Sequence, residues 1–97
     1  MTKTSKFDIA EHLRTEEEMA AYLDACIEES NHDATFIAKA LGDIARAKGM
    51  SKIASETGLS RESLYKALSG ERVPSLDTFM RVLRALNLKI TATPNIV

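Results

Sequence analysis

Residues 50–69 constrain the fold most, because a glycine separates two short segments whose apolar residues have helical spacing. Gly58 adopts positive φ without steric cost, so it ends the first segment abruptly. Ala54 is small enough for a second helix to cross close above it, and Ser60 is a favourable N-cap for that helix. The pattern predicts a helix-turn-helix, with helices over about 50–57 and 61–69.

Two further helices are expected before this unit. Thr15 followed by Glu18 forms a capping box, in which the Thr hydroxyl accepts a backbone N–H and the carboxylate reaches back. This box begins an acidic first helix over about 15–29. Asp33 is an N-cap for a second helix that Gly49 ends. Its apolar stripe comprises Ile37, Ala40, Leu41, Ile44 and Ala45.

A fifth helix is expected over residues 76–86, capped by Ser75 and closed by Asn87. Val82 falls beside its expected inward face, which comprises Leu76, Phe79, Met80, Leu83 and Leu86.

The segment after this helix, residues 88–93, alternates apolar and polar residues up to Pro94, which is the pattern of a strand. A lone strand must find an edge to pair with, and a second copy of the chain supplies one most economically. We therefore expect a homodimer whose seam includes Val82, Leu88 and Ile90. The alternative is a strand folded back onto its own domain.

The chain is expected to be one all-α domain of five helices with a short C-terminal β-strand. Residues 1–97 form that single domain, since domains usually hold about 100–200 residues. Aromatic residues make up 5% of the chain and Trp is absent, so the core must use Leu, Ile, Ala and Met. The expected parts are an N-terminal arm (1–14), the first two helices (15–48), the helix-turn-helix (50–69), and the last helix with the strand (75–93).

The lone cysteine, Cys26, excludes an internal disulfide and favours a reducing compartment. No apolar run is long enough to span a membrane, and the first residues lack the apolar region of a secretory signal. A cytoplasmic location without membrane contact is therefore expected.

The net charge of −1 conceals an asymmetry between the two halves. Residues 1–49 hold six Lys and Arg against ten Asp and Glu, whereas residues 50–97 hold seven against four. Such a division suggests two partners of opposite charge. Charge scattered only for solubility explains it equally well.

Polar side chains on the outer face of the 61–69 helix favour contact with double-stranded DNA over a plain packed corner. They are donors and acceptors that can reach base edges in a major groove, and the candidates are Ser60, Arg61, Glu62, Tyr65 and Lys66. The backbone N–H groups after Ser60 favour an anion. Phosphate contacts are expected from Ser51, Lys52, Ser69 and Arg72.

Three of these residues have roles that chemistry suggests. Arg61 can bind guanine O6 and N7 together, which discriminates by about 1–3 kcal/mol. Glu62 either accepts from a cytosine amine or pairs with Lys66 at i, i+4, and we favour the pairing. Tyr65 either contacts a thymine methyl or a phosphate, or packs beneath the preceding helix.

Residues 50–69 resemble the lambda-repressor and Cro class of helix-turn-helix proteins. The resemblance extends over about residues 7–93 to HigA-like "probable addiction module antidote" proteins, through FDIAEHL, ALGDIARAKGMSKIASETGLSRESLYKALSGE and RVLRALNLKI. It implies a lambda-repressor-like fold and an antitoxin of a type II toxin–antitoxin module. Such a protein represses its own operon and neutralises a small, basic RelE/HigB-like toxin.

Repression implies a dimer on a pseudo-palindromic operator, with recognition helices about 34 Å apart. The acidic first helix suits a basic toxin surface, with Glu16, Glu17, Met19, Tyr22 and Leu23 as the expected contacts. Alternatively, its carboxylates only favour the helix N-terminus and keep the chain soluble.

The sequence holds no pattern typical of an enzyme. His12 and His32 lack an i, i+4 partner, and neither zinc spacing nor a nucleophile motif is present. We therefore expect no catalytic residue, no metal ligand and no cofactor. Two other functions remain open, a stand-alone Cro-like regulator and a protein-only interaction module.

Overall fold

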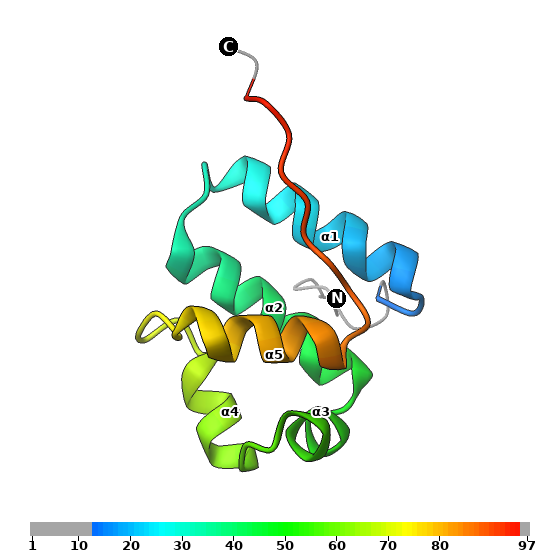
Figure 1. The fold of residues 1–97 in the computed structure, drawn as a ribbon, viewed down its shortest axis with the longest axis vertical. Coiled ribbons are helices and arrows are strands. Elements are labelled where there is room, and N and C mark those ends of the chain that lie inside the picture. Colours follow the sequence, from blue (N-terminus) through cyan, green and yellow to red (C-terminus); the bar gives the residue numbers. More distant parts are fainter. Residues whose placement is uncertain (1–12, 96–97) are drawn as a thin grey trace, which may run out of the picture.

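A computed structural model describes residues 13–95, and these contain five helices and no strand (Figure 1). All five lie close to the expected positions. They are α1 (Glu16–Glu29), α2 (Ala34–Lys48), α3 (Met50–Thr57), α4 (Arg61–Ala67) and α5 (Leu76–Ala85).

Helix α2 packs against α1 on one side and α3 on the other, while α3 also packs against α4 and α5. In Figure 1, α1 lies at one end of the molecule and the α3–α4 pair at the opposite end. The two ends differ in charge, because α1 carries no basic residue whereas Lys52, Arg61 and Lys66 lie on α3 and α4.

Side-chain caps begin four of the helices where the sequence predicted them. Thr15, Asp33, Ser60 and Ser75 each accept the backbone N–H of the residue three positions later. In the predicted capping box, Glu18 accepts from the backbone N–H of Arg14 at 2.8 Å, one residue before the expected partner. This hydrogen bond is the main cause that lowers the pKa of Glu18.

Residues with positive φ end α2, α3 and α5. Gly49 and Gly58 have φ values of 117° and 81°. Asn87 has φ 61° after α5, with Leu88 N–H donating to Leu83 O and Asn87 N–H to Arg84 O. Those two bonds make a Schellman motif, which satisfies carbonyls at the helix end. Helix α4 ends at Ala67, earlier than the expected residue 69.

Residues from all five helices share one hydrophobic core. Its fully buried large side chains are Leu41, Ile44, Ile53, Leu64, Val82, Leu83 and Leu86. The predicted stripe of α5 was wrong at three positions: Val82 is 0% exposed, whereas Leu76 is 76% and Met80 40% exposed. The burial of Val82 also removes it from the expected dimer seam.

Residues 88–95 form no strand in the single chain described, contrary to the expected strand over 88–93. The segment instead runs across α1 without regular structure (Figure 1). A strand needs hydrogen bonds from a neighbouring strand, and the described part of this chain offers none. Residues 1–12, which include most of the expected N-terminal arm and His12, lie outside the described residues.

Candidate nucleic-acid interface

The turn between α3 and α4 has the predicted geometry. Gly58 is in the left-handed conformation and its N–H donates to Ala54 O, which ends α3. Ser60 then caps α4 through its hydroxyl, which accepts from Ser63 N–H at 3.0 Å. On the inner side of α4, Leu64 is fully buried. The two helices therefore hold a fixed orientation in which one side of α4 faces solvent.

Gly42 lets the end of α4 lie close against α2. A Cβ atom placed on Gly42 would lie 2.8 Å from the backbone oxygen of Leu68, too close for any larger residue without a shift. Leu68 is itself buried at the end of α4. This backbone contact fixes how far α4 stands out from α2, which the sequence pattern did not indicate.

All nine residues predicted to contact DNA are exposed to solvent. Five lie on or beside α4, two on α3 and two in the loop after α4. Residues 13–95 cover none of the charged groups that were expected to reach bases or phosphates. The nine are Ser51, Lys52, Ser60, Arg61, Glu62, Tyr65, Lys66, Ser69 and Arg72.

Arg61 and Tyr65 form a pair on the outer side of α4. The Arg61 Nη2 group donates to the Tyr65 hydroxyl at 3.4 Å, and its guanidinium carbon lies 5.8 Å from the ring centroid. That separation is at the outer range of a cation–π contact. Tyr65 is 40% exposed, so it does not pack beneath the preceding helix.

Two i, i+4 ion pairs flank this pair. The Glu62 and Lys66 side chains are 3.9 Å apart, as the favoured prediction for Glu62 required, and Lys52 lies 3.7 Å from Glu56. All four side chains are well exposed, so each pair contributes little to stability. Both lysines can therefore exchange their carboxylate for a phosphate at small cost.

The loop after α4 uses one predicted phosphate contact for its own structure. The Ser69 hydroxyl donates to Lys66 O and accepts from Glu71 N–H, both at 3.1 Å. It therefore shapes the turn into Gly70, whose φ is 89°. Arg72 stands exposed on this turn.

Comparison with known proteins identifies the family. Residues 3–94 match the model of a family described as "Probable addiction module antidote protein". The chain belongs to this family. An uncharacterized protein of Haemophilus influenzae (strain ATCC 51907 / DSM 11121 / KW20 / Rd) is 53% identical over 90 residues, which cover 92% of this chain and 91% of that protein. No solved structure matches the chain.

Membership of an addiction module antidote family implies an antitoxin role and a toxin partner. The toxin surface predicted on α1 is wrong in part, because Met19 and Leu23 are buried in the core. Glu17 is exposed. Glu16 accepts from the Asn87 side chain at 3.0 Å and lies 3.5 Å from Lys48 Nζ, so it ties α1 to the ends of α5 and α2.

Tyr22, also predicted to contact the toxin, joins α1 to α2 in this antidote-family protein. Its hydroxyl donates to Asp43 Oδ2 at 2.7 Å, and Arg46 also pairs with Asp43. Burial, followed by the Asp43 hydrogen bond, raises the pKa of Tyr22 well above its usual range. Burial is also the main cause that raises the pKa of the nearby Cys26 thiol, which lies in the core.

The predicted dimer seam keeps two of its three residues at the surface. Val82 lies in the core, whereas Leu88 is half-buried and Ile90 is 45% exposed.

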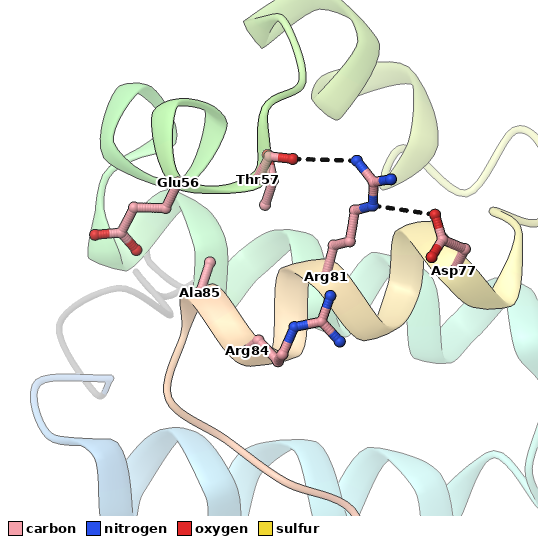
Figure 2. Close-up of a pocket in the computed structure, with 6 residues that line it drawn as sticks. All are labelled: Glu56, Thr57, Asp77, Arg81, Arg84 and Ala85. Atoms are coloured by element: carbon pink, nitrogen blue, oxygen red, sulfur yellow. Dashed lines mark hydrogen bonds and ion pairs between the residues drawn. The ribbon is translucent and has the colours of Figure 1, made fainter.

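A polar cleft between α3 and α5 was not foreseen from the sequence (Figure 2). Arg81 Nη1 donates to Thr57 O at 3.4 Å, and Arg81 Nε lies 3.0 Å from Asp77. Arg81 thereby links α5 to the last turn of α3, just before the turn into α4. The i, i+4 spacing of Asp77 and Arg81 was the available signal, although it did not reveal the Thr57 contact.

None of the described helices is long and apolar enough to cross a membrane. Within residues 13–95, no group of three or more His, Cys, Asp or Glu residues is arranged to hold a metal ion.

Proposed function

We propose that this chain is the antitoxin of a type II toxin–antitoxin module and represses its own operon by sequence-specific DNA binding. The observation that carries the proposal is the exposed polar side of α4, held outward by a buried Leu64 and a left-handed Gly58. In this proposal α3 and α4 form a lambda-repressor-like helix-turn-helix, and α4 enters the major groove.

The exposed side chains suit the two kinds of contact that such a helix makes. Arg61, near the start of α4, would bind guanine through both O6 and N7, and its hydrogen bond to the Tyr65 hydroxyl supports this role. Lys52, on α3, and Arg72, in the loop after α4, come before and after α4 in the sequence. We propose both as phosphate contacts. Ser60, Glu62 and Lys66 complete the proposed base-reading set, and Ser51 and Ser69 the phosphate set.

We propose that the protein binds a pseudo-palindromic operator as a homodimer. Residues 89–95 are exposed, and no backbone hydrogen bond joins them to the rest of the described chain. Pairing with the same segment of a second copy would satisfy these groups, with Leu88 and Ile90 at the seam.

We propose a small, basic RelE/HigB-like protein as the toxin that this antitoxin neutralises. The family supports a toxin partner, and the acidic α1 supports a basic one. This second activity uses the opposite end of the molecule from α3 and α4 (Figure 1).

A gel-shift titration on the chain's own upstream region tests the DNA half of the proposal. If a dimer neutralises about six phosphates, the log–log slope of affinity against salt should be about −5. Specific retention that fades with salt supports repression. Absence of binding at low salt would leave a protein-only interaction module, and repression in the absence of a toxin gene would indicate a stand-alone regulator.

A further inference from the structure

A groove of about 640 Å³ lies between α1, the start of α2, α5 and the C-terminal segment. Its apolar lining comes from four separate elements, namely Leu23 and Ile27 of α1, Ile37 of α2, Phe79 of α5, and Leu88 and Ile90 of the C-terminal segment. Most of these side chains are only partly covered. The groove therefore offers an apolar floor that the described chain leaves open to solvent.

The wall that α1 contributes to this groove is acidic. Asp24 and Glu28, one helical turn apart, line it, and neither takes part in an ion pair within the described residues. No residue of α1 is basic. Lys89 on the C-terminal segment contributes a single positive charge to the lining.

We infer that this groove docks a cationic amphipathic helix of the toxin. Apolar side chains of that helix would cover Ile27 and Phe79, while its Lys or Arg residues would meet Asp24 and Glu28. The inference rests on the proposed antitoxin function and moves its toxin surface from the predicted α1 residues Glu16, Glu17 and Met19 to the groove face, of which Leu23 forms part.

Charge decides between a basic partner and a second copy of this chain. Two copies meeting groove to groove would bring Asp24 and Glu28 of each against the acidic α1 of the other, and like charges oppose such contact. A cationic helix instead gains from Asp24 and Glu28, the α1 carboxylates that line the groove. Self-association that covers Ile27 and Phe79, as distinct from pairing of the 89–95 segments, is therefore an outcome against the inference.

A labelled synthetic peptide provides a direct probe. The peptide is an amphipathic helix of about five turns, with Leu on one face and Lys on the other. Its control has the same Leu face with Glu in place of Lys. Fluorescence anisotropy should show saturable binding of the Lys peptide and no binding of the Glu peptide. Changes in backbone amide NMR shifts on addition of the Lys peptide should map its site to Ile27, Phe79 and Leu88 rather than to α4.

Charge reversal in the groove should then weaken binding. The double variant Asp24→Lys/Glu28→Lys should lose about tenfold in affinity for the Lys peptide at low salt, since two attractions become repulsions. Glu29→Lys is the matched control on the same helix, exposed but outside the groove lining, and should change affinity less than twofold. Equal losses in both variants, or shifts confined to α4, would overturn the inference.

Binding and inhibition assays with the product of the neighbouring gene distinguish a wrong groove assignment from a wrong antitoxin function. If it binds and is inhibited by the native chain but not by Asp24→Lys/Glu28→Lys, the groove is the toxin site. If the reversed variant still inhibits it, the antitoxin function stands and the groove assignment fails. If it never binds although the Lys peptide does, the toxin assignment fails and the groove remains a site for cationic helices.

Discussion

At the scale of single residues, Arg61 carries the most specific claim about DNA. Its guanidinium is exposed and oriented by Tyr65, so replacing it should remove a base contact without disturbing the core. We expect Arg61→Ala to weaken the cognate operator by about 1–3 kcal/mol and to weaken random DNA far less. Lys52→Ala is the control and should weaken both DNAs alike. Competition gel shifts measure both, and equal losses for Arg61→Ala would make Arg61 a phosphate contact.

Tyr22 carries a claim about stability at the same scale. Its hydroxyl, half-buried and 2.7 Å from Asp43, donates to a charged acceptor between α1 and α2. Tyr22→Phe should lower the free energy of unfolding by about 1–2 kcal/mol in urea titrations. Tyr65→Phe, which removes an exposed hydroxyl, should change it by less than about 0.5 kcal/mol. A matching loss in both variants would show that the Tyr22 bond contributes nothing particular.

At the scale of elements, two glycines set the position of α4 in different ways. Gly42→Ala brings a Cβ against Leu68 O and should destabilise by about 1–2 kcal/mol, after the gain in helix propensity, while displacing α4. Gly58→Ala has open space around its Cβ and suffers only from φ 81°, at about 1 kcal/mol. Under conditions in which both variants are fully folded, Gly42→Ala should therefore lower the affinity for the operator more than Gly58→Ala does. A larger loss of affinity for Gly58→Ala would show that the α3–α4 turn, rather than the α2 contact, sets the position of α4.

The helices were predictable because their beginnings and ends depend on local chemistry. A Ser hydroxyl at position 60 or a glycine at 58 acts on atoms within a few residues, and both act as expected. The stripe of α5 was predicted less well, because its apolar residues form one broad face, and packing against the other helices buried the Val82 edge of that face rather than the Leu76 edge. The groove was also beyond prediction, since it joins Ile27 to Phe79 across the fold.

At the scale of the whole molecule, the C-terminal segment connects the two proposed activities, because Leu88 and Ile90 belong both to the groove lining and to the proposed dimer seam. Ile90→Lys places a charge in that seam while leaving the core intact. We expect it to shift sedimentation toward monomer and to reduce the salt slope of operator binding to roughly half of −5, because one protomer neutralises half the phosphates. Ala21→Lys, at an exposed residue of α1 outside both the segment and the proposed DNA contacts, should leave both unchanged. A dimer that persists in Ile90→Lys with the full slope would place the seam elsewhere and leave the C-terminal segment to the groove alone.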